Sequence, residues 1–204
     1  MARGPRAPKG LLRGHEHVTL ESMSETTEVR FTYDHYCQLP EGDRRELIEG
    51  EFYVTPAPTE KHQRICGNLY FELRLFLEKR PAGRAYTAPF DVILDKYSTV
   101  QPDLTFISTR RLGVLKSEGL RGAPDIAIEV LSPSTRSRDE ELKRALYFKH
   151  GTRELWLVDP QEELVSVYSR QKEGLELWRT FCRGDELASP FLPELRISVD
   201  AIFR

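Results

Sequence analysis

Two carboxylates, Asp103 and Glu129, lie in or beside apolar runs that have the alternation of β-strands. Asp103 precedes Leu-Thr-Phe-Ile, and Glu129 lies on the face opposite to the one that Ile126, Ile128 and Val130 share. A buried, unpaired carboxylate is costly, so two of them in neighbouring strands need a compensating partner. A shared divalent cation such as Mg2+ would meet this need and could activate water beside a phosphate. A salt bridge, or a strand whose second face is wet, is the alternative.

A lysine and a polar turn follow these strands. Lys143 lies in a predicted helix, with Tyr147 one turn later on the same face. A Lys ammonium beside a scissile phosphate could position the attacking water or offset negative charge, although a solvated helix lysine is the commoner case. Ser132, in the turn after Glu129, could hold water or phosphate, and ordinary turn chemistry is the alternative.

The elements that must position these residues are predicted from periodicity. Helices are expected at 33–39, 60–79 and 138–150. Strands or hairpins are expected at 45–55, 84–88, 90–94, 100–107, 125–131, 153–159, 164–169 and 175–181. The last helix joins two buried strands, which predicts a right-handed parallel crossover. The order indicates a mixed α/β (α+β) fold, in one domain over 30–204.

The N-terminal segment differs from the rest of the chain. Residues 1–29 combine Pro, Gly and Arg with a polar stretch that has no apolar periodicity, so we expect a disordered arm. Met23 opens a second natural start. We therefore hypothesise that residues 1–22 arise from the choice of start site, which N-terminal mass measurement would test.

Composition excludes several classes of protein. The net charge of −2 argues against a protein that coats duplex nucleic acid, but it is compatible with acids gathered around a metal. No apolar run approaches the roughly 20 residues of a membrane-spanning helix, and no signal peptide is expected. The cysteines Cys37, Cys66 and Cys182 are widely spaced, so we expect reduced thiols in a cytoplasmic protein and no zinc site.

Several stretches together resemble a known family. They are residues 46–51, 101–105, 122–135, 143–147 and 154–160, within a similarity that covers about 31–204. The chain resembles the Uma-type restriction endonuclease family of the PD-(D/E)XK nuclease superfamily. The resemblance implies a restriction-endonuclease-like mixed β-sheet core flanked by helices, with additional antiparallel strands. It also implies Mg2+ as cofactor, with Mn2+ able to substitute, and DNA as the expected substrate.

The resemblance also implies roles for single residues. Asp103 and Glu129 would be the metal ligands. The superfamily has a lysine two residues after the second acid, where this chain has Leu131. In the Uma-type family a lysine of the following helix takes its place, which implies Lys143 as the catalytic lysine.

An auxiliary acid is expected from the first hairpin. It is placed at Glu46, with Glu49 and Glu51 as alternatives. His62, at the start of the first long helix, would orient this acid or contact substrate. An exposed polar residue in a first helical turn is the equally frequent alternative.

Three functions are compatible with these patterns. The favoured one is a Mg2+-dependent endonuclease, because all three catalytic positions carry competent residues. The others are a catalytically inactive member that binds nucleic acid or a protein partner, and a structural protein whose acids form salt bridges. A homodimer through apolar residues of 164–181 is a further conjecture. Basic residues cluster in sequence around the site: Arg110, Arg111, Lys116, Arg121, Arg136, Arg138, Lys143 and Arg144.

Overall fold

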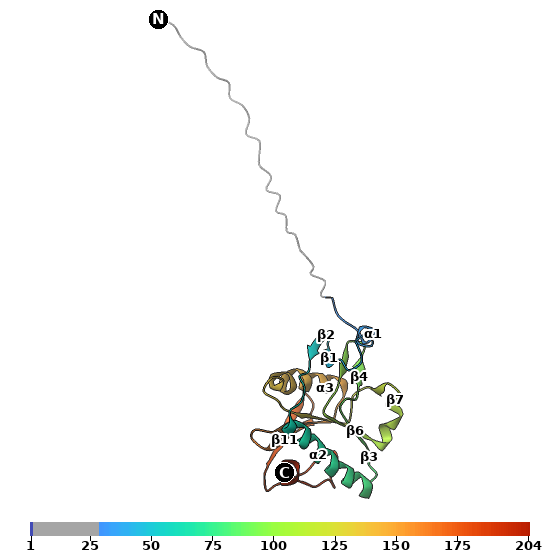
Figure 1. Cartoon of the computed structure of the whole chain (residues 1–204), viewed down its shortest axis with the longest axis vertical. Coiled ribbons are helices and arrows are strands. Elements are labelled where there is room, and N and C mark those ends of the chain that lie inside the picture. Colours follow the sequence, from blue (N-terminus) through green and yellow to red (C-terminus); the bar gives the residue numbers. More distant parts are fainter. Residues whose placement is uncertain (2–28) are drawn as a thin grey trace.

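The computed structural model describes Met1 and residues 29–204 of the chain (Figure 1). The arm expected at 1–29 and the hypothesis about residues 1–22 therefore lie almost entirely outside the described residues. Within the described part, helices and two six-stranded sheets form the mixed α+β architecture that the sequence predicts. No helix among these residues is long and apolar enough to cross a membrane.

The first sheet has the strand order β2-β1-β5-β4-β8-β7. Its hairpin, β1 (Arg45–Ile48) and β2 (Glu51–Val54), confirms the hairpin expected at 45–55. The turn between them needs left-handed backbone, with φ of 50° at Glu49 and 93° at Gly50. The other strands are β4 (Val92–Asp95), β5 (Ser98–Val100), β7 (Leu115–Lys116) and β8 (Gly119–Arg121). The short helix α1 (Tyr33–Tyr36) lies beside this sheet (Figure 1).

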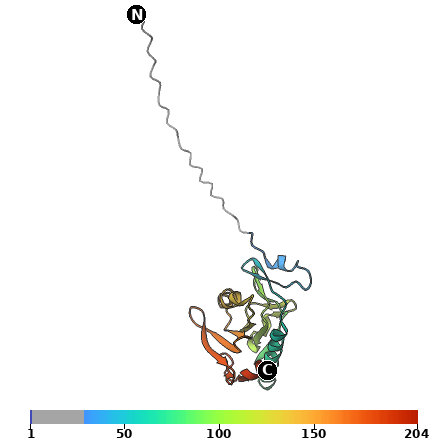
Figure 2. The same cartoon turned by 60° about the vertical axis from the view of Figure 1, so that its left-hand side comes forward.

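The second sheet has the order β12-β11-β10-β9-β6-β3. Its strands are β3 (Gly83–Thr87), β6 (Leu104–Ser108), β9 (Ile126–Val130), β10 (Glu154–Asp159), β11 (Leu164–Arg170) and β12 (Leu175–Cys182). Strands β9 and β10 are parallel, which confirms the predicted crossover. Strands β11 and β12 form the expected antiparallel pair at one edge of the domain (Figure 2).

One predicted strand is wrong. The run 100–107 is divided into β5 and β6, which belong to different sheets. The break falls at residues 101–103, where Pro102 has no N–H to donate to a ladder. The Gln101 amide turns instead to Glu46 Oε1, 2.9 Å away. Asp103 consequently lies at the start of β6, on the path between the two sheets.

The helices cover opposite faces of the second sheet. Helix α2 (Glu60–Lys79) has the predicted bounds, and Thr59 Oγ1 accepts a hydrogen bond from the His62 amide at its start. Its stripe of Ile65, Leu69 and Leu73 packs in one core with the β9 face that carries Ile128. The C-terminal helix α4 (Val199–Ile202) lies against α2, and the C-terminus is near it in Figure 1.

The opposite face of β9 packs against the second predicted helix. A π-helical turn, Arg138–Lys143, continues directly into α3 (Arg144–His150). Tyr147 and Leu146 join Ala127 and Leu131 in a second core. Loop 108–124 contains a 3-10 helix, Thr109–Val114, before β7 and β8. The chain ends with the small pair β13 (Glu186–Leu187) and β14 (Ile197–Ser198).

Candidate active site

Asp103 is oriented by the strand that carries Glu129. Leu104 pairs with Ile128, and the Val130 amide donates a hydrogen bond of 2.8 Å to Asp103 Oδ2. Asp103 thus lies at the start of β6, beside the end of β9. Its side chain is 21% exposed, so it is partly accessible to solvent.

Glu129 is buried on the α3 side of the sheet. Tyr147 donates a hydrogen bond of 2.7 Å to Glu129 Oε1, and Lys143 Nζ lies 3.1 Å from the same oxygen. Burial raises the pKa of Glu129 well above its usual range, although Lys143 acts in the opposite direction. The predicted acid and the predicted lysine are therefore in direct contact.

Lys143 pairs with three carboxylates. Besides Glu129, its Nζ lies 2.9 Å from Glu46 Oε1 and 3.5 Å from Asp139 Oδ1. Burial lowers the pKa of Lys143, but the surrounding negative charge outweighs burial and raises it. Lys143 is therefore a buried lysine paired with carboxylates rather than a solvated helix lysine.

Among the acids of the first hairpin, the structure brings Glu46 to the cluster. Glu46 is buried, accepts from the Gln101 amide, and has Arg138 at 4.0 Å. Glu49 lies in the hairpin turn and pairs with exposed Lys149, at 2.7 Å. Glu51 is exposed and accepts from a tyrosine of the same strand.

Asp139 is a member of the cluster that sequence analysis missed. It is 3% exposed, and burial raises its pKa above the usual range. The π-helical turn places it against Lys143, four residues later. A signal was present in the sequence, since an acid four residues before a lysine often contacts it on a helix.

The cluster has an excess of negative charge. Glu46, Glu129 and Asp139 surround Lys143, and Asp103 adds a fourth carboxylate near them. Arg138, 4.0 Å from Glu46, is a second cation beside these four acids. Among the described residues, Glu46 Oε2 and Asp139 Oδ1 are buried without a hydrogen-bond partner. Such an excess in a poorly solvated place favours a bound cation.

The donor set fits a hard divalent cation. Hydrogen bonds of the described residues reach Asp103 Oδ2 and Glu129 Oε1, but none reaches Asp103 Oδ1 or Glu129 Oε2. Mg2+ is commonly held by one or two carboxylates, with waters and substrate phosphate completing its shell. Two carboxylates from adjacent strands meet that pattern.

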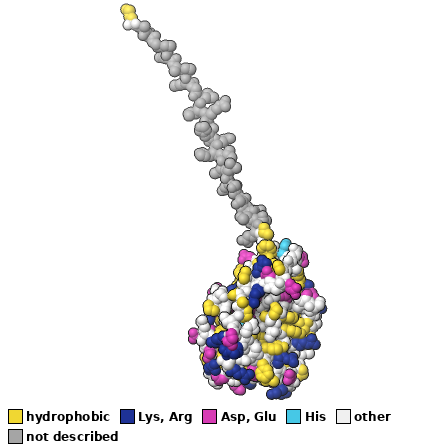
Figure 3. Space-filling model, in the orientation of Figure 1, with side chains coloured by type: hydrophobic (Ala, Val, Ile, Leu, Met, Phe, Trp, Pro, Cys, Tyr) yellow, Lys and Arg dark blue, Asp and Glu magenta, His cyan; other side chains and the backbone are white. Residues whose placement is uncertain are grey.

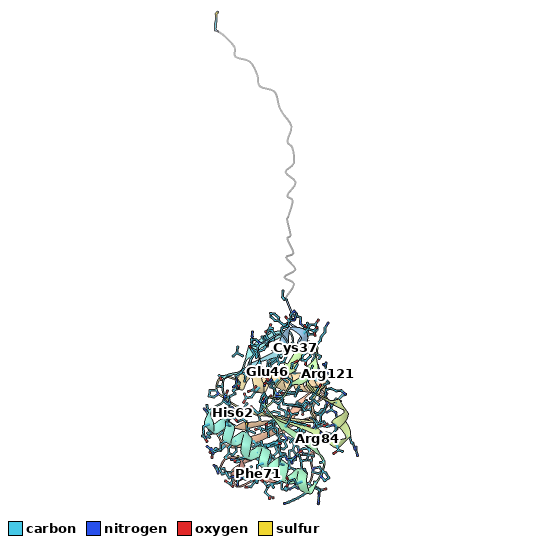
Figure 4. All side chains as sticks on the ribbon, turned by 45° about the vertical axis from the view of Figure 1, so that its right-hand side comes forward. Cys37, Glu46, His62, Phe71, Arg84 and Arg121 are labelled. Atoms are coloured by element: carbon cyan, nitrogen blue, oxygen red, sulfur yellow. The ribbon has the colours of Figure 1, made fainter. Side chains whose placement is uncertain are left out.

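His62 contacts Asp103 rather than the auxiliary acid. Its Nε2 lies 3.3 Å from Asp103 Oδ2, and Figure 4 shows His62 at the end of α2 that is nearer to Glu46. Burial lowers the pKa of His62, but Asp103 reverses this effect and raises it. Ser132 Oγ bonds with Thr135 Oγ1 at 2.9 Å, so turn formation accounts for its contacts. A substrate contact of Ser132 stays a prediction.

Comparison with known proteins assigns the family. A family model described as "Uma2: Putative restriction endonuclease" matches residues 32–200. This chain belongs to that family. The predicted resemblance is confirmed.

A solved structure has the same fold as this chain. It is described as a "putative nuclease belonging to DUF820" from Anabaena variabilis, and it is 26% identical with a TM-score of 0.70. The match covers 85% of this chain and 97% of the other. No curated protein matches the chain. The predicted fold class is confirmed by this likeness.

Proposed function

We propose that this chain is a metal-dependent nuclease that hydrolyses phosphodiester bonds in DNA, with Mg2+ as its cofactor and Mn2+ able to replace it. The observation that carries the proposal is the contact of Lys143 with Glu129, next to Asp103 on the adjacent strand. Family membership and the nuclease title of the solved relative support the same reaction class.

Each residue of the cluster has a chemical role in this proposal. Asp103 and Glu129 would hold the ion. When bound, a divalent ion would polarise the phosphate and lower the pKa of a water molecule. Lys143 orients Glu129 and places a fixed positive charge close to the phosphate, where negative charge develops. Glu46 and Asp139 hold the ammonium of Lys143 in position.

Two further residues support these groups. Tyr147 fixes Glu129 Oε1, which leaves Oε2 for the ion. His62 fixes Asp103 Oδ2 together with the Val130 amide. Both residues act by orienting a ligand, as partners of metal ligands commonly do.

Surface charge favours an enzyme over a protein that coats DNA. Figure 3 shows basic and acidic side chains interspersed on one face rather than a continuous basic stripe. Affinity for DNA would therefore depend on local contacts near the site, such as half-buried Arg136. A catalytically inactive member of the family that binds nucleic acid or a protein partner is the alternative.

The experiment that tests the function is a cleavage assay with paired variants. Plasmid DNA is incubated with the protein and Mg2+ or Mn2+, and with Asp103→Ala, Glu129→Ala and Glu46→Gln. Glu49→Gln is the matched control, because this acid lies in the same hairpin but outside the cluster. Cleavage by the wild type and Glu49→Gln alone supports the proposal. Equal cleavage by the Asp103 and Glu129 variants, or none by any protein, contradicts it.

A homodimer and a cytoplasmic location belong to the same proposal. Leu177 and Trp178 on β12 are about half exposed, at 54% and 45%. β12 is also the edge strand of its sheet. An exposed apolar edge of this kind favours association. Analytical ultracentrifugation would detect a dimer, and Trp178→Glu should shift it to monomer.

A further inference from the structure

Three side chains with different donor atoms converge at the start of α2. His62 and Cys66 are four residues apart, so they share one face of the helix. His62 Nδ1 lies 3.6 Å from Cys66 Sγ, and His62 Nε2 lies 3.3 Å from Asp103 Oδ2. One donor atom from each residue can be chosen so that all three lie within 4.8 Å of one another. Glu129 is outside this group.

These donors suit a different ion from the carboxylate pair. Nitrogen, thiolate and carboxylate together are typical ligands of Zn2+, whereas Mg2+ prefers oxygen alone. Three protein ligands with one open position is also the usual arrangement of a zinc site that is accessible to solvent. The side chains of His62 and Asp103 are 15% and 21% exposed, so an ion can reach them from the surface.

We propose that His62, Cys66 and Asp103 form a Zn2+ site that shares Asp103 with the Mg2+ site, so that bound Zn2+ inhibits the nuclease. The inhibition rests on the proposed function, but the binding of zinc does not. The single negative charge of Asp103 cannot neutralise two cations at once, so Zn2+ bound to Asp103 weakens the binding of Mg2+. The nuclease would therefore be inhibited by Zn2+, which binds thiolates, and active with Mg2+ alone.

The site needs only a small contraction to bind zinc. With Zn–N and Zn–S bonds of about 2.1 and about 2.3 Å, tetrahedral ligands lie roughly 3.5 Å apart. The donor atoms lie within 4.8 Å of one another, and they have to come closer by turning the His62 ring, which now faces Cys66 with one nitrogen and Asp103 with the other. The metal displaces the thiol proton, as it does at other cysteine ligands.

No zinc site is expected from the sequence, because the cysteines are widely spaced and form no CxxC pair. Here a single cysteine would act with a histidine of its own helix and an acid that precedes a distant strand. Cys66 and Asp103 come within 4.8 Å because α2 packs against β6 and β9, which cysteine spacing does not report.

Cobalt binding tests the site directly. Co2+ replaces Zn2+ and gives a thiolate-to-metal absorption band in the near ultraviolet when a cysteine is a ligand. The wild type should bind one equivalent with this band. Cys66→Ala should lose the band, whereas Cys37→Ala/Cys182→Ala, which removes the exposed thiols, should keep it. Zn2+ should displace the Co2+. A wild type without the band, or a band that persists in Cys66→Ala, overturns the site.

The participation of the other two ligands has its own readout. Removing a residue that only hydrogen-bonds to a metal ligand costs about 10- to 100-fold in metal affinity. Removing a ligand itself should therefore cost at least that much. Asp103→Asn and His62→Gln should each weaken Co2+ binding by this amount. Circular dichroism establishes that each variant is folded. Unchanged affinity in the folded Asp103→Asn variant contradicts the shared ligand.

Inhibition is measured separately, as the ratio of cleavage with and without Zn2+ at constant Mg2+. For the wild type at saturating Zn2+ this ratio should be about one tenth or less, and for Cys66→Ala it should remain near one. Cobalt binding without inhibition overturns the shared Asp103. If the wild type does not cleave DNA with Mg2+ at all, the proposed function fails, and the zinc site is decided by the cobalt titration alone.

Discussion

Lys143 Nζ lies 3.1 Å from Glu129 Oε1, although the two residues belong to a helix and a strand and are 14 positions apart. The position two residues after Glu129, where the superfamily has its lysine, is occupied by buried Leu131. The helix that follows β9 thus supplies an ammonium to the same carboxylate. Substitutions at this contact should therefore change both the stability of the domain and the charge of the site.

Replacing Glu129 should stabilise the metal-free protein. Burial raises the pKa of Glu129, so its ionised form is disfavoured in the folded state. An acid with a raised folded pKa lowers stability at every pH above its unfolded pKa. Glu129→Gln should therefore raise Tm at neutral pH, by about 2–4 °C for each kcal/mol recovered, and should abolish cleavage. Calorimetry measures the first effect, and a lower Tm would contradict the prediction.

Removing the lysine should have the opposite effect. Lys143→Met removes the ammonium that lies between three buried carboxylates and leaves Arg138, 4.0 Å from Glu46, as the nearby cation; breaking such a cluster costs about 3–5 kcal/mol. The matched control is Lys149→Met, whose ion pair with Glu49 is on the surface and contributes about 0–1 kcal/mol. Urea unfolding measures both. Similar losses for the two variants would show that Lys143 is not the cation of a buried cluster.

Mg2+ should stabilise the folded protein through the carboxylate pair. A ligand at 100 times its Kd raises the free energy of unfolding by about 2.7 kcal/mol. We expect Tm to rise with Mg2+ and to return when the ion is chelated. Glu129→Gln should show no such rise, whereas Glu49→Gln should behave as the wild type. A rise of equal size in Glu129→Gln would place the ion elsewhere.

The burial of His150 predicts that the protein loses stability in mild acid. Burial lowers its pKa below the usual 6.5, even though Asp95 lies 3.6 Å away and favours the charged form. The unfolded chain then binds a proton more readily than the folded one. The contribution of His150 to stability is complete at pH values above its pKa in the unfolded chain. It is lost as the pH falls through the pKa of His150 in the folded protein. The difference in unfolding free energy between about pH 8 and about pH 5 should be smaller in His150→Gln than in the wild type.

The outcome that would contradict this prediction is an equal difference between the two pH values in the wild type and in His150→Gln, because burial of His150 would then not contribute to the acid sensitivity.

The parts of the fold that sequence predicted are those with a local cause. Helix α2 follows from a stripe of apolar residues with a three- and four-residue period, and its bounds agree with the prediction. The position of Asp103 beside β9 follows from alternation in two neighbouring strands. The family resemblance implied Lys143 as the catalytic lysine, because nothing local distinguishes this lysine from a solvated one. Its contact with Glu129 was not predicted and is a finding of the structure.

The parts that sequence did not predict depend on contacts between distant segments. The run 100–107 breaks at Pro102, but which sheet each half joins depends on distant strands, and the Gln101 amide donates a hydrogen bond to Glu46 of β1. Glu46 and Glu51 lie on the same face of the hairpin, because Glu46 pairs with Tyr53 and Ile48 pairs with Glu51. The choice between them therefore depends on which part of that face the rest of the domain covers, and alternation along the strand does not report this. Asp139 enters the cluster through an irregular helical turn that apolar periodicity does not reveal.

The π-helical turn at Arg138–Lys143 also sets how this segment can vary in length. Such a turn holds one residue more than the α-helical turn it replaces. Deleting a single residue there would restore the regular helix and rotate everything before it by about 100° relative to Tyr147. Arg138 would then move away from Glu46, while Lys143 and Tyr147, four residues apart, stayed on one face. Substitutions at an exposed position of this segment, such as Glu141, should accordingly be tolerated far better than a change in its length by one codon.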